Sequence, residues 1–336
     1  MTFVPILTKI FFLTASAFGV SILLTPILTH FLYKYKFRQK IKKHAITGEK
    51  APVYARLHQE KALTPTGGGV LIWIATAIIT FVFNLSRSET WLPLATLVSS
   101  GILGLVDDFL NVLSIGLKKG LGFLQKFILQ IIIAVVGAWW FYYKLGFNII
   151  HVPGVGNFEI GYWYIPLFIL VILATTNAVN ITDGLDGLAG GCLATSFGAY
   201  GVIAFIQGKT GIAGFCCTIC GALLAFLWFN IYPARFFMGD TGSLALGATL
   251  GVIAMLTNSV LVLPIIGFVF VIETLSVIIQ ILSKKLRKGK KIFRSAPLHH
   301  HLEAIGWPEP KIVMRLWVIS GVFAILGLII GLIGRG

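Results

Sequence analysis

The sequence predicts an all-α polytopic integral membrane protein with about ten transmembrane helices. Of its 336 residues, 57% are hydrophobic and only 12% are charged, whereas a soluble domain carries about 25% charged residues. The mean hydropathy is +0.91, and apolar runs close to the roughly 20 residues that cross a bilayer recur along the whole chain. Membrane lipid is therefore the expected solvent for most of the surface.

Ten apolar runs give the expected spans. They cover residues 6–33, 67–86, 91–106, 122–143, 163–179, 186–206, 211–232, 241–257, 261–283 and 312–333. The shorter runs are expected to be tilted or broken where they line a cavity. The first run is too long, and too poor in basic residues at its start, for a cleaved signal peptide, so we expect it to be retained.

The basic residues indicate how the chain is oriented. The net charge is +15, and 22 of the 27 Lys and Arg residues fall on one side of the predicted membrane. The positive-inside rule places that side in the cytoplasm and both termini outside. The topology explains the charge without nucleic acid, although anionic lipid headgroups or an anionic substrate could also use it. In the outer connection 144–162, the Gly156-Asn157 pair between short apolar stretches predicts a small hairpin.

The polar connections are too short to form a second domain. The longest has about 30 residues, which cannot build an independent core. We therefore expect one transmembrane domain, 1–336, whose active face consists of cytoplasmic loops. Their predicted bounds are 34–66, 107–121, 177–186, 230–243 and 284–311.

All five aspartates lie in these cytoplasmic connections or at their helix edges, where carboxylates are costly and usually functional. Asp107 and Asp108 end the third predicted span. Neighbours on a helix point about 100° apart, so we expect one carboxylate to face the site and the other to hold a lysine.

The second group contains Asn177, Asn180, Asp183 and Asp186, with glycines between them. If this turn is helical, the two carboxylates share one face. A helix-capping role explains one pair of residues but not the two asparagines. A polar stretch punctuated by glycines at membrane depth is tolerated where it lines a cavity, so we expect a substrate site.

The third group is Phe237-Met-Gly239-Asp240-Thr-Gly-Ser243, preceded by Asn230. Glycines at a helix start let backbone N–H groups approach a phosphate. Asp240 is an oxygen ligand of the kind that Mg²⁺ takes together with substrate phosphates; helix capping is the alternative. Residues 64–69, Thr-Pro-Thr-Gly-Gly-Gly, form a second glycine-rich helix start.

The last cytoplasmic loop carries His299, His300 and His301. Hydrogen bonds from them to phosphate or sugar are more plausible than a zinc site, because no second His/Cys cluster completes one. Glu273 and Gln280 lie seven residues apart near one face of the ninth span. Glu273 could serve the site or pair inside the bundle, and the residues alone favour neither.

Together these stretches resemble the polyprenyl-phosphate N-acetylhexosamine-1-phosphate transferases. The resemblance covers essentially the whole chain. It rests on residues 64–68, 106–109, 177–187, 237–243 and 296–301. The Ala-Pro-Leu-His-His-His stretch is similar to that of the muramoyl-pentapeptide branch of the family.

The resemblance implies a reaction at the inner face of the bacterial cytoplasmic membrane. UDP-N-acetylmuramoyl-pentapeptide is joined to undecaprenyl phosphate with Mg²⁺ as cofactor, which releases UMP and gives the first lipid-linked peptidoglycan precursor. It suggests a homodimer and implies no nucleic acid partner. It implies Asp240 as the Mg²⁺ ligand and Asp107 as the base or phosphate-positioning group.

The resemblance also implies the other site residues. Asp108 and the three histidines join Asp107 and Asp240 as catalytic residues. The substrate-binding set is Lys61, Thr66, Asn177, Asn180, Asp183, Gly184, Leu185, Asp186, Asn230, Phe237, Gly239 and Gln280. Asn111 stands where the family usually has a lysine. In this chain the basic residues of that loop come later, as Lys118 and Lys119.

Three other functions stay open at this point. An N-acetylglucosamine-1-phosphate transferase would share the aspartates but not the triple histidine. A lipid-phosphate transporter would use the same basic face without releasing UMP. An intramembrane prenyltransferase needs two Asp-rich motifs, and Asp183-x-x-Asp186 is the only Asp-x-x-Asp in the sequence.

Overall fold

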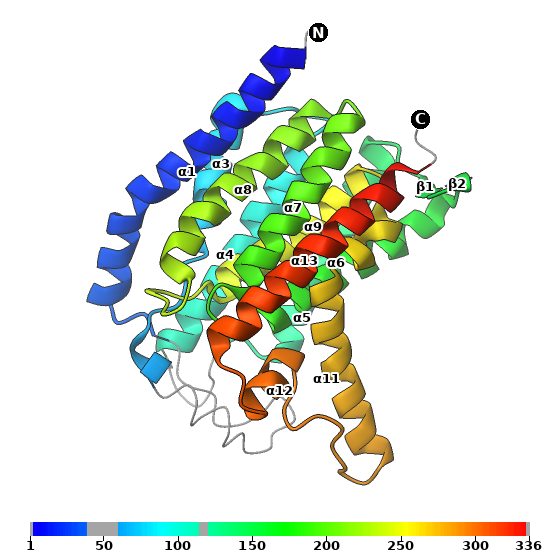
Figure 1. The fold of residues 1–336 in the computed structure, drawn as a ribbon. Helices are drawn as coiled ribbons and strands as arrows, with labels where there is room; N and C mark the ends of the chain where they lie inside the picture. Colours follow the sequence, from blue (N-terminus) through cyan, green and yellow to red (C-terminus); the bar gives the residue numbers. More distant parts are fainter. Residues whose placement is uncertain (1–2, 39–59, 114–119, 334–336) are drawn as a thin grey trace.

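The computed structural model describes residues 3–38, 60–113 and 120–333, and this part of the chain is a helical bundle (Figure 1). The long helices are α1 (Phe3–Lys34), α3 (Val70–Phe83), α4 (Trp91–Leu113), α5 (Phe123–Trp139), α6 (Tyr164–Thr182), α7 (Leu188–Ile206), α8 (Thr210–Asn230), α9 (Gly239–Leu256), α11 (Phe268–Leu286) and α13 (Glu309–Leu332). The short helices are η1 (Glu60–Leu63), η2 (Trp140–Lys144), η3 (Gly161–Trp163), η4 (Val260–Val262), α10 (Leu263–Ile266) and α12 (Leu298–Ala304). Most of the predicted loop 34–66, and Lys118 and Lys119, lie outside the described residues.

The all-α membrane class is confirmed. Within the described ranges, eight helices are long and apolar enough to cross a membrane, or nine if the bent pair 260–286 is one span. Each predicted run contains a helix, but α3 has only 14 residues, about 21 Å at 1.5 Å per residue, against a hydrocarbon core of about 30 Å. The count of ten spans therefore stays a prediction.

The ninth predicted span is broken. The segment Val260–Ile266 and α11 meet at an angle of 81°, with Gly267 at the break. Beyond it α11 leaves the bundle and ends in a projecting turn (Figure 1). This break places Glu273 and Gln280 on an arm that reaches under the bundle toward α12.

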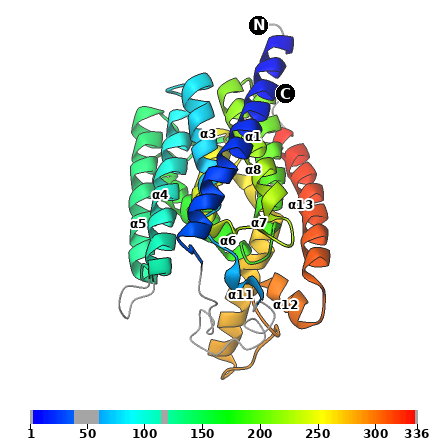
Figure 2. The ribbon, with the colours of Figure 1, turned by 90° about the vertical axis from the view of Figure 1, so that its left-hand side faces the viewer.

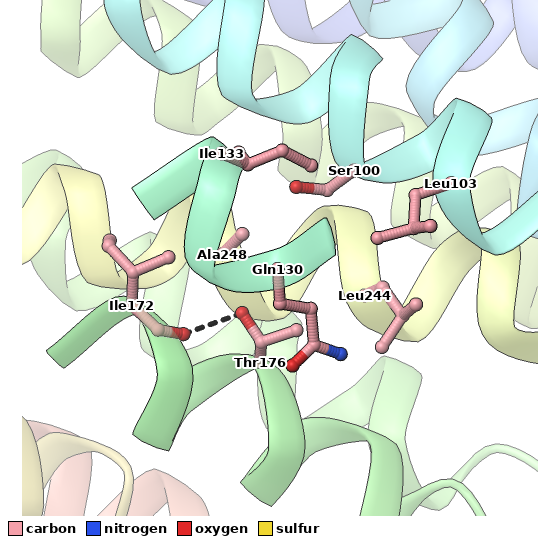
Figure 3. A pocket seen from close by; sticks show the side chains of 8 residues that line it. All are labelled: Ser100, Leu103, Gln130, Ile133, Ile172, Thr176, Leu244 and Ala248. Carbon is pink, nitrogen blue, oxygen red and sulfur yellow. Dashed lines mark hydrogen bonds between the residues drawn. The ribbon is translucent and has the colours of Figure 1, made fainter. Parts of the chain in front are cut away.

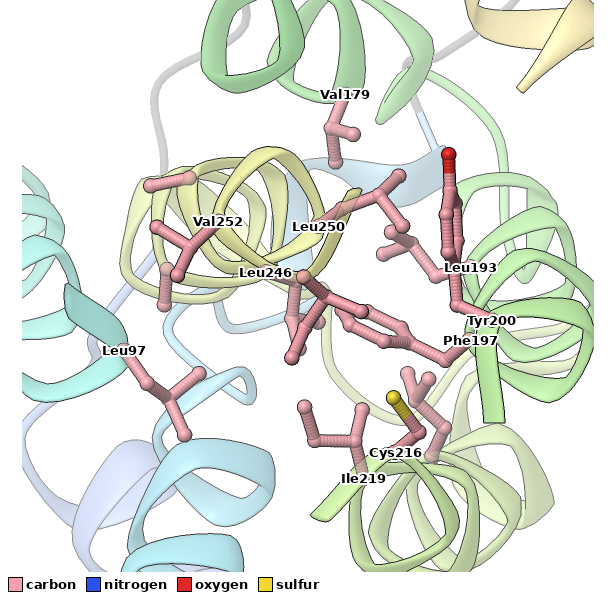
Figure 4. Packing of buried hydrophobic residues seen from close by; sticks show 14 of the residues in the cluster. Leu97, Val179, Leu193, Phe197, Tyr200, Cys216, Ile219, Leu246, Leu250 and Val252 are labelled. Carbon is pink, nitrogen blue, oxygen red and sulfur yellow. The ribbon is translucent and has the colours of Figure 1, made fainter. Parts of the chain in front are cut away.

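Helix α9 forms the centre of the bundle. In its membrane-length segment 89% of the residues are buried, compared with 28% of those in α1 and 22% of those in the segment containing α5. Glycines allow this close packing: a Cβ on Gly242 would lie 2.8 Å from the Cα of Gly69, and one on Gly247 would lie 2.8 Å from the Cα of Thr176. Side chains of the surrounding helices converge on Leu246 and Leu250 (Figure 4). The peripheral helices α1, α5 and α13 surround this centre (Figure 2).

The predicted hairpin is present as β1 (Ile149–Val152) and β2 (Gly156–Glu159), with His151 opposite Asn157. Its turn, however, lies at residues 153–155, where the Val155 N–H bonds the Val152 carbonyl. Gly156 and Asn157 belong to the second strand, so the prediction placed the turn too late. Helix α1 begins and α13 ends at the hairpin end of the bundle (Figure 1). That arrangement agrees with an even number of spans, and the outside location of both termini stays a prediction.

Candidate active site

Three helices bring charged side chains together at the end of the bundle opposite the hairpin. Lys126 of α5 lies between Asp107 of α4 and Asp240 of α9. Its Nζ is 2.8 Å from Asp107 Oδ2 and also contacts Asp240 Oδ2. Asn180 of α6 donates to Asp240 Oδ1 at 2.7 Å and to the Ser243 hydroxyl at 2.9 Å. Two predicted aspartates and one predicted asparagine therefore meet around Lys126, which the sequence indicated only as one of the 22 basic residues on the cytoplasmic side.

Asp107 is held from three sides. Its Oδ1 accepts the Leu121 N–H at 2.8 Å, and its Oδ2 accepts the Asn111 side-chain amide at 3.0 Å as well as Lys126. Asn111, which departs from the family pattern, thus binds the aspartate directly. The ammonium group beside Asp107 comes from Lys126 of α5.

Asp108 has a different role from its neighbour. It is 1% exposed, and it accepts the backbone N–H groups of Asp240 at 3.2 Å and Thr241 at 3.1 Å. It therefore caps α9, whose N-terminal dipole favours a carboxylate. The alternative of helix capping, weighed above for Asp240, applies to Asp108. Helix α4 continues to Leu113, beyond the predicted end of the third span at residue 106.

Gly239 lies where no side chain fits. Its φ is +74°, and a Cβ there would lie 2.5 Å from Asp108 Oδ2 and 2.7 Å from Thr66 Oγ1. Because L-residues rarely adopt this conformation, glycine is required at this position. Thr66 is 1% exposed, and its hydroxyl has no partner among the described residues.

The first glycine-rich segment packs instead of forming an open cradle. The N–H groups of Gly68 and Gly69 bond the carbonyls of Phe237 and Met238, each at 2.8 Å. A Cβ on Gly69 would lie 2.3 Å from the Cα of Gly242. These glycines therefore join α3 to α9, and their N–H groups are already used.

Asp183 and Asp186 follow the end of α6 at Thr182, and the turn between them is not helical. The conditional expectation of a shared helix face therefore does not apply. Burial, together with the charge of Asp240, raises the pKa of Asp183 to about 7, although the backbone of Gly239 bonds its carboxylate. Asp183 thus faces the start of α9, whereas Asp186 faces Lys61.

Lys61 and Asp186 form a second charged group with Glu309, the first residue of α13. Lys61 Nζ lies 2.6 Å from Asp186 Oδ1 and 2.5 Å from Glu309 Oε1. Glu309 also accepts the Asp186 backbone N–H at 2.7 Å. The rings of Tyr232 and Phe237 lie 5.9 and 5.8 Å from the ammonium. Burial lowers the pKa of Lys61, but the two carboxylates outweigh it and raise that pKa above its ordinary value, so the lysine stays charged.

The three histidines are not equivalent. His299 is fully buried and bonded to Glu273. His300 Nδ1 lies 2.6 Å from Glu303 Oε2, and His301 Nδ1 accepts the backbone N–H of Arg294 at 3.1 Å. His299 lies against the turn after α6, since a Cβ on Gly184 would lie 2.3 Å from its Nε2.

Three predicted substrate-binding residues form hydrogen bonds within the protein, and their substrate-binding role stays a prediction. Asn177 donates to Gln130 at 3.0 Å, one turn into the bundle from Asn180. Asn230 accepts the Gly187 N–H at 2.9 Å and donates to the Phe236 carbonyl at 2.9 Å. Gln280 bonds the backbone of residues 292 and 293 through both ends of its amide. Leu185 is 4% exposed and belongs to the apolar core.

A small pocket is lined by residues of α4, α5, α6 and α9 (Figure 3). Its lining includes Leu103, Gln130, Thr176 and Leu244, each four residues from Asp107, Lys126, Asn180 and Asp240 respectively. Residues four apart lie on one helix face, so the pocket is the membrane-side continuation of the same cluster.

The chain is similar to known proteins over nearly its whole length. The model of the family described as "Glycosyl transferase family 4" matches residues 90–258, about half of the chain. A phospho-N-acetylmuramoyl-pentapeptide-transferase of Geobacillus thermodenitrificans is 44% identical over 324 residues, which covers 94% of this chain and 96% of the relative. The proteins of that name from Bacillus subtilis (43%; 96% and 97% covered) and Chloroflexus aggregans (40%; 96% and 89% covered) are similar over the same extent.

The fold and these similarities define a membrane-embedded phospho-sugar transferase. With relatives above 40% identity over nearly its full length, the chain belongs to the phospho-N-acetylmuramoyl-pentapeptide-transferase family.

Proposed function

We propose that this enzyme transfers phospho-N-acetylmuramoyl-pentapeptide from UDP to undecaprenyl phosphate, releasing UMP, at the cytoplasmic face of a bacterial inner membrane. The family membership supports the transferred group. One observation carries the site: Asp107, Lys126, Asn180 and Asp240, from four different helices, converge at one end of the bundle.

A magnesium ion fits the donor set of this site. The carboxylates of Asp107 and Asp240 offer hard oxygens, which suit Mg²⁺. Within the described ranges, no group of three or more His, Cys, Asp or Glu side chains is arranged to hold a metal. Mg²⁺ usually takes one or two carboxylates and completes its shell with water and substrate phosphates. Asp240 is the proposed protein ligand, and the ion when bound would neutralise the diphosphate charge.

The contacts of Asp107 favour positioning over base catalysis. A phosphate monoester has a second pKa near 6, so the lipid phosphate is already largely dianionic at pH 7 and needs no base. Both oxygens of Asp107 accept hydrogen bonds from Leu121, Asn111 and Lys126. A carboxylate bonded in this way is a poor nucleophile, so we propose direct attack of the lipid phosphate instead of a covalent aspartyl intermediate.

The second charged group is proposed to bind the nucleotide-sugar. Lys61 stays charged between two carboxylates, and the Phe237 and Tyr232 rings lie beside it. An aromatic face next to a fixed cation suits a planar base joined to a diphosphate. We assign the transfer itself to the first group, which contains Asp240.

The direct test is UMP release by the purified protein with undecaprenyl phosphate and Mg²⁺. UDP-N-acetylmuramoyl-pentapeptide and UDP-N-acetylglucosamine are compared, for wild type and Asp240→Asn. Turnover of the muramoyl substrate alone, lost in the variant, is expected. Turnover of UDP-N-acetylglucosamine would assign the sister activity, and no UMP from either donor would favour a transporter.

A further inference from the structure

Glu273 and His299 form a contact that is sealed from solvent. Both side chains are 0% exposed. Glu273 Oε2 lies 2.9 Å from His299 Nδ1 and accepts the His299 backbone N–H at 3.2 Å. One carboxylate oxygen thus fixes both the backbone and the ring of the histidine, across the gap between α11 and α12.

The second ring nitrogen of His299, Nε2, lies on the side of the imidazole away from Glu273. His299 Nε2 is buried and has no hydrogen-bond partner among the described residues, although a buried polar atom is costly to leave unpaired. It points at the turn after α6, because a Cβ on Gly184 would lie 2.3 Å from it. Asp183, the neighbour of Gly184, is the C-cap residue of α6 at the start of this turn. The unpaired nitrogen therefore faces the candidate substrate-binding turn.

The pairing decides which nitrogen is available. A carboxylate oxygen accepts, so Nδ1 of His299 carries a proton. In the tautomer whose single proton is on Nδ1, Nε2 is a hydrogen-bond acceptor. His300 and His301 are held by different partners, Glu303 and the Arg294 backbone. Neither of them shares the Glu273 contact.

We propose that Glu273 is a positioning residue for His299, holding its Nε2 toward the Asp183–Gly184 turn to accept a hydrogen bond from a hydroxyl or amide N–H of the sugar substrate. The inference rests on the proposed function, because it assigns a contact within that site. The function of Glu273 is to set the proton and the orientation of the ring, and it does not touch the substrate itself.

The first test compares Glu273→Gln, Glu273→Asp and His299→Ala in UMP release. Glu273→Gln is expected to lower kcat/KM about 10- to 100-fold, the range in which histidines that bind metals lose function without the carboxylate that orients them. Glu273→Asp should recover part of this loss. The double variant Glu273→Gln/His299→Ala should be no worse than His299→Ala, because one residue acts through the other. Additive losses would overturn the proposal.

The matched control is Glu89→Gln. Glu89 also accepts backbone N–H groups at a helix start, those of Gly211 and Ile212 at 2.6 and 3.1 Å, but at the hairpin end of the bundle. It should leave kcat/KM unchanged even where it lowers thermal stability. An equal loss of kcat/KM in the control would assign the effect of Glu273 to general destabilisation.

A second readout needs no turnover. Nitrogen-15 NMR of protein labelled at histidine should show His299, assigned by its loss in His299→Ala, with a proton on Nδ1 and none on Nε2. The Glu273→Gln variant should lose this preference. A proton on Nε2 in wild type would overturn the inference even if the enzyme is active. Failure of UMP release in wild type with the expected tautomer would instead count against the proposed function and the substrate contact that rests on it.

Discussion

The carboxylate of Asp108 accepts the backbone N–H of Asp240 at 3.2 Å. Asp108 of α4 therefore positions Asp240, the proposed magnesium ligand, by binding the main chain of Asp240 and not its side chain. The adjacent Asp107 reaches the same segment through Lys126. Two consecutive aspartates thus act on one helix start by two different routes.

Asp108→Ala should reduce both stability and activity. Losing a helix cap lowers the free energy of unfolding by about 0.5–2 kcal/mol. Without the cap, the start of α9 should move and Asp240 should shift with it. Thermal unfolding in detergent and UMP release measure the two effects. Asp107→Asn is the comparison: it should lose activity with a smaller change in melting temperature. If Asp108→Ala melts like wild type, its capping role is refuted.

Lys126→Met should lower the transfer rate on the order of 100-fold, the scale for removing one group that stabilises charge in an active site. The substitution leaves Asp107 and Asp240 without their shared cation. Lys144→Met removes a lysine at the opposite end of the same span, in η2, and should be near wild type. Equal effects of the two substitutions would mean that Lys126 contributes only to topology.

Glu309→Gln should raise KM for the nucleotide-sugar more than it lowers kcat. Glu309 holds both Lys61 and the Asp186 backbone, so its loss loosens the proposed nucleotide group while leaving Asp240 untouched. Steady-state kinetics with varied donor concentration separate the two constants. An effect confined to kcat would move Glu309 out of the binding group.

Asp183→Asn should raise the melting temperature of metal-free protein at pH 8 but not at pH 4. The folded-state pKa of Asp183, about 7, lies above its ordinary value of 3.8. The folded protein therefore binds the extra proton between these pH values, and wild-type stability falls as pH rises from about 4 to 7. The variant lacks this fall. Melting curves across that range in EDTA provide the test, and parallel curves for the two proteins would contradict it.

The sequence predicted the bundle well because lipid imposes long apolar runs that no other structure explains. It also predicted that Asp107, Asn180 and Asp240 would face one site, because charged and polar side chains at a membrane edge are costly and usually functional. It could not place Lys126, Glu309 or Asp108 in their roles, because these depend on how neighbouring helices are rotated. Lys126 gave one usable signal, a lone lysine within the first turn of a span four residues before Gln130.

The same limit applies to predicted substrate-binding residues that also have contacts within the protein. Asn230 and Gln280 look like binding residues in the sequence because they are polar within apolar surroundings. In the fold, the amide oxygen and the amide nitrogen of each residue form hydrogen bonds with backbone groups of a nearby turn. Such polar residues satisfy the backbone where a helix stops inside a membrane protein, and only coordinates separate that use from catalysis.

The burial of α9 has a consequence for how the chain can vary. Its glycines leave no space for a methyl group, while α1, α5 and α13 present most of their surface outward. A saturation scan should therefore divide the molecule sharply. On the outer helices, most exchanges of one apolar residue for another should be silent. Along residues 239–251, even glycine to alanine should be lethal to a cell that depends on this enzyme.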